Sequence, residues 1–525
     1  MPRLLLLALL VLASSTAHAA TITVNTTDTE DNTDGDCSLR EAMLSAELDQ
    51  AIDACTAGNG ADVITFSVAG TFTLDVGFRF TTEVTLRGMS PSETILTGSV
   101  TSQLLEVQNA TARFERLTIE GGGATPITDG AFLFFAGANV TLEDVVIRNV
   151  SNDGDGGAIV ASGANSLTLI RTRFLGNRVT GFGSGGGLYA INSSVTIRES
   201  EFRDNVSPGQ GGGVFFTNNF PLVVEKSTFS GNEAETGGGL HLNSGTGTVS
   251  VSTFANNRAT RSGGGIYVGS ATADLLSLTI TGNVADADSD GDGDGGGIWG
   301  FSGVTLVNSA VSSNEDRGGA VAPDLSIGNV WTSGGTNFIS DGRGAMSIFP
   351  AGTPNATGDF VGTEAAPLDP MLGTLGNNGG FTATRLPLMG SPLIDAGDCV
   401  GINEDQRGGA RPAGADCDIG AVEAEAVIST SSTPEPTEPS LVLGAPAPNP
   451  ARDAFSVDFL GTDSRHAVRV TLHDVTGRTV RVLHDGPVPT SLRLGVSVDG
   501  LAPGVYLLVA QSGAGAATQR LTVVR

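Results

Sequence analysis

A short motif of the form Phe-x-x-Asn recurs about every 27 residues through the middle of this chain. Four copies begin with phenylalanine, at Phe174, Phe202, Phe229 and Phe254. The other copies begin with smaller apolar residues, at Ile119, Val146, Ile280 and Val311. Glycine triplets lie between the copies and begin at Gly185, Gly211, Gly237, Gly263 and Gly295. A period of this length indicates one structural unit that stacks on copies of itself.

The residues of one repeat predict short strands joined by sharp turns. Residues 194–198 alternate polar and apolar, which is typical of a strand with one buried face. The glycines allow the positive φ that tight turns require. Asn177 and its equivalents tolerate the left-handed conformation and predict a ladder of stacked amides, while Phe174 and its equivalents predict an internal stack of rings.

A period near 27 accommodates three strands and three turns, which form one coil of a parallel β-helix with coils ~4.8 Å apart. The consensus of leucine-rich repeats and the Trp-Asp signature of propeller blades are both missing. We therefore expect an all-β solenoid over residues 61–345.

The N-terminus predicts export. Residues 1–19 contain Arg3, a leucine-rich stretch of about 10 apolar residues and an Ala-His-Ala cleavage site, the pattern of a signal peptide. So short a stretch cannot span a bilayer core of ~30 Å, and no later segment is apolar enough to do so. The formal net charge of −28 is unfavourable for nucleic acid and for anionic membrane surfaces.

Four cysteines occur in two pairs, and the members of each pair are 18 residues apart in the sequence. In an oxidising compartment we expect two local disulfides, Cys37 with Cys55 and Cys399 with Cys417. Four cysteines allow three connectivities, so the other two stay open.

Several of these motifs resemble known families of secreted β-helices. The glycine and Phe-x-x-Asn motifs resemble the repeats of chlamydial polymorphic outer-membrane proteins, which implies a right-handed helix and a role in adhesion. The string Cys-Ser-Leu-Arg-Glu-Ala at 37–42 resembles a module that begins such proteins and implies a capping module over 20–60. Residues 346–425 resemble a choice-of-anchor-type segment that closes such helices. This chain ends in Val-Val-Arg, without the terminal aromatic of the chlamydial proteins.

A Pro/Ser/Thr-rich linker at 426–440 precedes a domain of different composition at 441–525. Residues 467–473 and 478–483 alternate like strands around an Asp-Val-Thr-Gly turn. The domain resembles the C-terminal sorting domain of the type IX secretion system, which implies a small immunoglobulin-like β-sandwich and the secretion machinery as partner. A generic module of the same fold without an export role is the alternative.

An acidic loop near residue 290 is a candidate calcium site. Asp286, Asp288, Asp290 and Gly291 match positions 1, 3, 5 and 6 of an EF-hand-like loop, and carboxylate oxygens at this spacing suit Ca²⁺. Asp292 and Asp294 extend the series, but Gly297 stands where the bidentate glutamate is expected. A solvated acidic loop is the alternative. A fainter copy contains Glu30, Asn32, Asp34, Gly35 and Asp36.

A row of aromatic residues is a candidate binding surface. Each lies two residues after a glycine triplet, and the row contains Tyr189, Phe215, His241, Tyr267 and Trp299. Aliphatic residues precede them, so strand alternation places the two series on opposite faces. If the aliphatics face the core, the rings form an exposed ladder on which sugars could stack. In the alternative, the rings are buried or covered by a loop.

Two functions remain open. The chain is either a secreted or cell-surface adhesin that binds an extracellular polysaccharide or a host or neighbouring cell without catalysis, or an extracellular polysaccharide lyase or glycoside hydrolase of the pectin-lyase-like fold. Motifs of known β-helix lyases and hydrolases do not occur. Before the C-terminal domain the mature chain has a single histidine, His241, and a single lysine, Lys226, so the first function is favoured.

Overall fold

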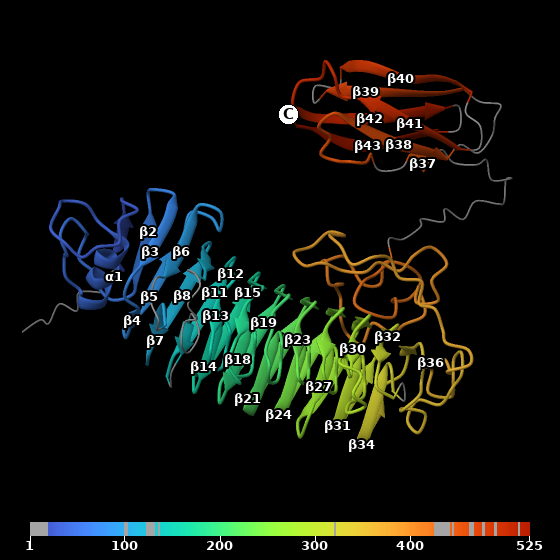
Figure 1. Cartoon of the computed structure of the whole chain (residues 1–525), viewed down its shortest axis with the longest axis horizontal. Coiled ribbons are helices and arrows are strands. Elements are labelled where there is room, and N and C mark those ends of the chain that lie inside the picture. The colour runs from blue at the N-terminus through green and yellow to red at the C-terminus, as the bar shows by residue number, and fades with distance from the viewer. Residues whose placement is uncertain are drawn as a thin grey trace, which may run out of the picture. The chain divides into compact units, whose positions relative to one another are not determined.

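The computed structural model describes residues 19–98, 103–121, 132–134, 137–319, 322–424, 442–443, 446–460, 467–474, 478–487, 491–512 and 515–524. The chain forms two units, which meet in sequence at Val427 and Ile428 (Figure 1). The expected signal peptide, apart from Ala19, and the expected linker lie outside these residues. No helix in the described ranges is long and apolar enough to cross a membrane.

The first unit is the expected parallel β-helix. Each coil contributes strands to two long sheets, and every ladder between coils is parallel. An 18-stranded sheet contains two columns of strands, which are β1 (Thr21–Val24), β2 (Asp62–Phe66), β4 (Phe78–Phe80), β5 (Val84–Arg87), β7 (Leu105–Val107), β8 (Thr111–Glu115), β10 (Phe132–Phe134), β11 (Asn139–Glu143), β14 (Ile159–Ser162), β15 (Ser166–Ile170), β18 (Leu188–Ile191), β19 (Ser194–Arg198), β21 (Val214–Glu225), β24 (Leu240–Ser250), β27 (Ile266–Val268), β28 (Thr272–Leu276), β31 (Ile298–Val307) and β34 (Leu325–Ser333).

The second long sheet has 12 strands, which are β3 (Gly70–Leu74), β6 (Thr94–Gly98), β9 (Thr118–Glu120), β12 (Val146–Arg148), β16 (Arg173–Leu175), β20 (Glu201–Arg203), β22 (Thr228–Ser230), β25 (Thr253–Ala255), β29 (Thr279–Thr281), β32 (Ala310–Ser312), β35 (Phe338–Ile339) and β36 (Phe360–Val361). Two-residue strands pair between coils on a further side, and these are β13 (Ser151–Asn152), β17 (Arg178–Val179), β23 (Glu233–Ala234), β26 (Arg258–Ala259), β30 (Val284–Ala285) and β33 (Glu315–Asp316).

The predicted phenylalanine stack fills the core beneath the 12-stranded sheet. Phe174 and Phe202 lie 4.4 Å apart between ring centroids, and their planes differ by 5°. Phe229 and Phe254 continue the stack at 4.9 and 4.6 Å, and all four side chains are fully buried. Burial of one such ring contributes about 1.5–3 kcal/mol, to which ring pairing adds about 0.5–1.5 kcal/mol.

The asparagine ladder is also present, with a correction. Asn177 donates its backbone N–H (3.1 Å) and its Nδ2 (3.0 Å) to Oδ1 of Asn205, and the pattern repeats from coil to coil as far as Asn314. The left-handed residue is the one before the ladder position, as at Gly176 (φ 63°) and Asp204 (φ 57°), and not the asparagine itself. The turn therefore lies one residue before the asparagine. The asparagine itself donates both its backbone N–H and its Nδ2 to the next coil.

The same rule corrects the frame of one repeat. Ile147, and not Val146, pairs with Phe174, so Val150 occupies the ladder position. Asn149 is the left-handed residue of that coil (φ 55°). In the glycine triplets the first residue has positive φ, as at Gly185 (φ 74°), and a Cβ on Gly186 would collide with the carbonyl oxygen of Gly212 in the next coil.

A helix covers the N-terminal end. Within the described residues the single helix is α1 (Leu39–Leu48), and Ser38 and Glu41 cap each other's backbone N–H at its start. The disulfide between Cys37 and Cys55 joins the segment just before this helix to the loop that follows it. The second disulfide, between Cys399 and Cys417, lies in the closing segment, so both expected pairings are present.

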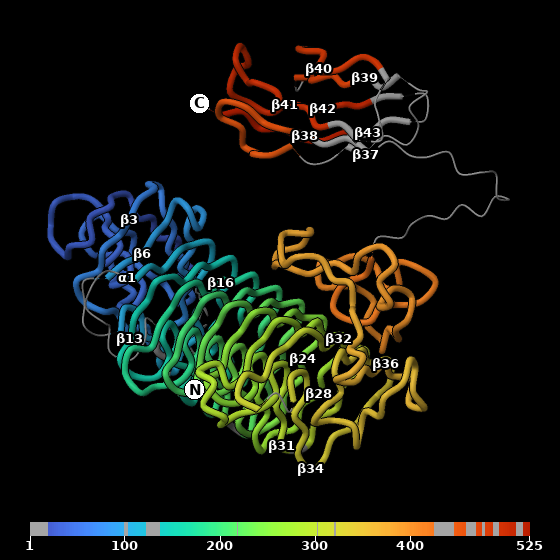
Figure 2. The backbone as a smooth tube through the Cα atoms, turned by 45° about the vertical axis from the view of Figure 1, so that its right-hand side comes forward, coloured from blue at the N-terminus to red at the C-terminus, as the bar shows by residue number. Residues whose placement is uncertain are grey.

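The closing segment, residues 346–424, covers the C-terminal end of the β-helix and then runs back along one side of it. Phe349 is buried at the end of the core, with its ring edge-on to Trp331 at 6.4 Å. Residues 371–424 lie against the outer face of the 12-stranded sheet, where Thr228 donates to the Ala383 carbonyl (2.6 Å) and Asn308 donates to the Asp418 carbonyl (3.0 Å) (Figure 2).

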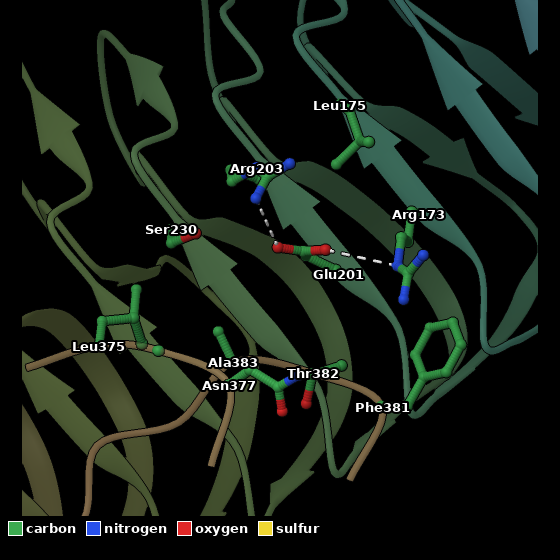
Figure 3. A pocket seen from close by; sticks show the side chains of 11 residues that line it. Arg173, Leu175, Glu201, Arg203, Ser230, Leu375, Asn377, Phe381, Thr382 and Ala383 are labelled. Atoms are coloured by element: carbon green, nitrogen blue, oxygen red, sulfur yellow. Dashed lines mark ion pairs between the residues drawn. The ribbon is translucent and has the colours of Figure 1, made fainter. Parts of the chain in front are cut away.

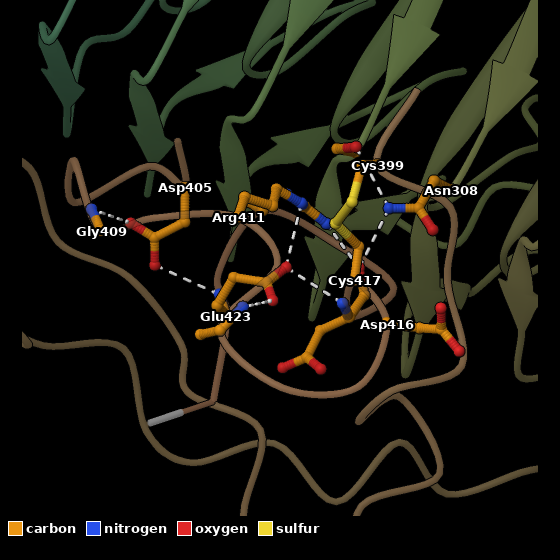
Figure 4. A network of polar contacts seen from close by, with 12 residues as sticks. Asn308, Cys399, Asp405, Gly409, Arg411, Asp416, Cys417 and Glu423 are labelled. Carbon is orange, nitrogen blue, oxygen red and sulfur yellow. Dashed lines mark hydrogen bonds and ion pairs between the residues drawn. A yellow bond between two sulfur atoms is a disulfide. The ribbon is translucent and has the colours of Figure 1, made fainter. Parts of the chain in front are cut away.

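Buried charges hold this returning segment together (Figure 4). Arg411 and Glu423 form an ion pair of 3.0 Å between Nε and Oε1, with side chains 0% and 2% exposed. Asp405 pairs with Arg407 at 2.9 Å. Burial raises the pKa of Glu423 and of Asp418 and lowers that of Arg411, because each group loses water around its charged form.

The second unit consists of two antiparallel sheets that enclose a separate apolar core. One sheet contains β37 (Val442–Leu443), β38 (Ala454–Leu460) and β41 (Ser491–Ser497), and the other contains β40 (Thr479–Pro487), β39 (Ala467–Asp474), β42 (Gly504–Ser512) and β43 (Gly515–Val523). The expected hairpin is present as β39 and β40, although its turn lies outside the described residues.

Candidate functional site

The aromatic row is in register across five coils. Tyr189 pairs with Phe215, and the row continues through His241 and Tyr267 to Trp299. The residues that precede them point into the core and are at most 1% exposed, and these are Leu188, Val214, Leu240, Ile266 and Ile298. The rings therefore lie on the outer face of the 18-stranded sheet, as strand alternation predicts.

The rings stack on one another along the helix axis. Centroid distances are 5.1 Å from Tyr189 to Phe215, 5.2 Å from Phe215 to His241, and 4.3 Å for both remaining steps. Phe215 and His241 are 6% and 1% exposed, whereas Tyr189, Tyr267 and Trp299 are half-buried. Because neighbouring rings cover the faces, a ligand on this side meets ring edges and the polar atoms of Tyr and Trp.

His241 is held as a neutral ring inside this row. Its Nδ1 lies 2.9 Å from Oγ1 of Thr236. Burial lowers the pKa of His241 to about 4, since the charged form would lose its hydration. No carboxylate among the described residues hydrogen-bonds to the ring. An imidazole with this pKa is unprotonated near pH 7 and is a weak general base.

The acidic loop brings three of its five aspartates together. Ligand atoms of Asp286, Asp288 and Asp290 lie within 4.8 Å of one another. Asp286 is buried, and its carboxylate accepts the backbone N–H of Asp290 (3.0 Å) and of Gly291 (2.9 Å). Oxygen ligands in this arrangement suit Ca²⁺.

The other two aspartates of the loop have different neighbours. Asp292 pairs with Arg261 at 3.1 Å. Burial, and then the nearby Asp316, raise the pKa of Asp294. In the fainter copy, Asp53 accepts the backbone N–H of Gly35 (2.7 Å), and no metal-like group of three carboxylates forms there among the described residues.

A cleft that the sequence interpretation missed lies between β16, β20 and β22 and residues 375–383 (Figure 3). Its volume is about 480 Å³, and Arg173, Glu201 and Arg203 form its charged wall. The same two outward positions carry Thr228 and Ser230 one coil later. That change from charged to small residues marks where the closing segment begins to cover the sheet. It is the feature of the sequence from which the cleft could have been predicted.

Comparisons with known proteins agree with the two units. Residues 99–254 match the right handed beta helix region, residues 251–269 match the repeat of the Chlamydia polymorphic membrane protein, and residues 447–524 match the secretion system C-terminal sorting domain. No curated protein matches the chain.

A solved structure of Geobacillus virus E2, ORF18, is similar at 13% identity and a TM-score of 0.24. The similarity covers 59% of this chain and 61% of that one. The sorting domain indicates export to the cell surface or beyond, with the type IX secretion machinery as partner. The chain is a right-handed parallel β-helix repeat protein that ends in a secretion sorting domain.

Proposed function

We propose that this exported protein binds an extracellular polysaccharide, or the glycan coat of a neighbouring or host cell, without cleaving it. The observation that carries the proposal is the aromatic ladder on the outer face. The core is already filled by the aliphatic and phenylalanine series, so packing does not require these five rings. Three of the five rings, Tyr189, Tyr267 and Trp299, keep part of their surface exposed on this face, and an exposed aromatic surface supports an interaction site.

The geometry of the ladder favours a linear polymer. Five rings in register extend for four coil spacings, roughly 20 Å along the axis. Stacking holds the rings rigid, so little side-chain entropy remains to be lost on binding. The half-buried Tyr189, Tyr267 and Trp299 supply hydroxyl and indole N–H groups for hydrogen bonds to sugars.

A panel of polysaccharides, applied to the full mature chain, tests the proposal. We expect retention without new reducing ends or unsaturated products, and about tenfold weaker retention for Trp299→Ala or Tyr267→Ala. Thr196→Ala is the matched control, because Thr196 is also half-buried and lies outward on β19, in the other column of strands of the same sheet. Product release that His241→Ala abolishes would instead support the lyase or hydrolase.

Asp286, Asp288 and Asp290 are further proposed to bind Ca²⁺ and to stabilise the loop. At 100 times its dissociation constant, a bound ion adds about 2.7 kcal/mol to the free energy of unfolding. We expect EDTA to lower the melting temperature of the wild type and to leave Asp288→Asn unchanged. Equal melting temperatures for the wild type with Ca²⁺ and with EDTA would contradict this site.

A further inference from the structure

The cleft in Figure 3 exists because the closing segment leaves the sheet surface at one place. At the start of β22, the Thr382 hydroxyl donates to the Lys226 carbonyl (3.3 Å), and the Thr228 hydroxyl donates to the Ala383 carbonyl (2.6 Å). Phe381 directly precedes Thr382, and its ring lies under the Arg173 guanidinium, 4.4 Å from Cζ to the centroid. The space between these contacts lies over β16 and β20.

Two guanidinium groups in this cleft share one carboxylate. Glu201 lies between them, with its oxygens 3.6 Å from Arg173 Nε and 3.5 Å from Arg203 Nη1. Asp204 lies 3.9 Å from Arg203 Nε and is 70% exposed. No side-chain hydrogen bond of either arginine is found among the described residues. One carboxylate cannot occupy the donors of two arginines, since each carries five N–H groups.

A neighbouring arginine on the same sheet shows the contrast. Arg148, on β12, donates to both oxygens of Glu120 at 3.1 and 3.0 Å. The side chains of Arg173 and Arg203 are 40% and 49% exposed and line the cleft, and the contrast with Arg148 is that neither donates a side-chain hydrogen bond to a described residue. Arginine forks with free donors match the paired oxygens of a carboxylate or a sulfate.

We propose that this cleft binds one anionic sugar unit, a ring that carries a carboxylate or a sulfate. A volume of about 480 Å³ lies in the range of small-molecule sites and has room for one or two rings. Phe381 and Leu175 provide apolar walls, while Ser230 and Asn377 can bond ring hydroxyls. The net charge of −28 does not prevent this, because screening at physiological salt limits distant repulsion to ~8 Å.

This inference rests on the proposed function only for the polymer to which the unit belongs. The test is calorimetric titration of the full mature chain with glucuronate, with glucose 6-sulfate and with glucose. We expect at least one anionic sugar to bind at least tenfold more tightly than glucose, and the stronger of the two identifies the anionic group.

Variants locate the site. We expect Arg203→Gln and Arg173→Gln to weaken anion binding at least tenfold, and Arg203→Lys to weaken it less, since charge remains while the fork is lost. Arg148→Gln is the control and should bind as the wild type does. Thermal unfolding of each variant checks that it is folded, and Arg203→Gln decides the matter if Arg173→Gln loosens the Phe381 loop.

Two results would overturn the inference: no binding of either anion at millimolar concentration, or equal weakening by Arg148→Gln and Arg203→Gln. Its failure differs from failure of the proposed function. If polysaccharide is retained equally by wild type and Arg203→Gln, the cleft is excluded from the polysaccharide site and the aromatic ladder stands. If small anions bind but no polysaccharide is retained, the reverse holds.

Discussion

In the β-helix the buried phenylalanines and asparagines contact equivalent residues in the next coil, whereas residues 371–424 are held by contacts that occur once. Phe202 stacks on Phe229, and Asn205 bonds Asn232, with almost the same geometry in successive coils. The returning segment instead depends on single pairs such as Arg411 with Glu423. A repeated contact can be predicted from the period of the sequence, whereas a polar contact that occurs once leaves no period in the sequence.

The largest expected effect comes from breaking the repeated stack. Phe229→Ala removes a fully buried ring that is stacked between Phe202 and Phe254, and such truncations cost about 3–5 kcal/mol. Denaturant unfolding of the first unit measures the loss. Phe182→Ala, which alters a fully exposed ring, should change stability by less than about 0.5 kcal/mol. Equal losses for the two variants would refute the stack as a stabilising element.

Breaking a unique contact should act locally. Glu423→Gln leaves the Arg411 charge buried without its partner, at a cost of about 3–5 kcal/mol. We expect faster proteolysis of residues 371–424 while the coils stay protected. Glu404→Gln, which removes the 58% exposed partner of Lys226, should cost at most about 1 kcal/mol. Simultaneous loss of the coils and the segment would show that the two regions are not separable.

Protonation of His241 makes the stability of the aromatic ladder depend on pH. His241 has a pKa of about 4 in the folded chain and 6.5 when unperturbed, so the unfolded chain takes up the proton first as the pH falls. Above pH 6.5 this histidine does not reduce the free energy of unfolding. As the pH falls toward 4, proton uptake by the unfolded chain lowers the free energy of unfolding, in total by about 3 kcal/mol. His241→Phe should therefore gain stability relative to the wild type between pH 7 and pH 4. Parallel pH profiles of the two proteins would contradict a buried, neutral ring.

A smaller effect is expected at one rung of the amide ladder. Asn232→Ala removes the Oδ1 that accepts the backbone N–H of Asn205 (3.0 Å) and its Nδ2 (2.9 Å). Water that enters the space left by the side chain can satisfy both donors, so the expected loss is the net contribution of two hydrogen bonds, about 1–3 kcal/mol in total. Amide exchange at Asn205 should report the change. Unaltered protection there would mean that the side-chain ladder adds little to the backbone ladder.

The period of the sequence was enough to predict the coils, the core stack and the outward side of Tyr189 through Trp299. It failed at Val146 by one residue, because an Asn in the turn resembled an Asn in the ladder. It could not show that rings on the outer face stack on one another, since that depends on the coil spacing and not on residue type. The sequence did not predict the Arg173 cleft, because its two sides come from segments about 200 residues apart. It did not predict the Arg411–Glu423 pair, because that segment contains no repeat.

We propose above that the aromatic ladder on the outer face of the 18-stranded sheet binds a polysaccharide and leaves it intact. The most direct measurement is equilibrium binding of the retained polysaccharide to the full mature chain, with its size distribution recorded before and after incubation. We expect the length of the polysaccharide to stay unchanged and Trp299→Ala to bind it about tenfold more weakly than Thr196→Ala does. Shortened polysaccharide, or equal affinities of the two variants, would contradict it.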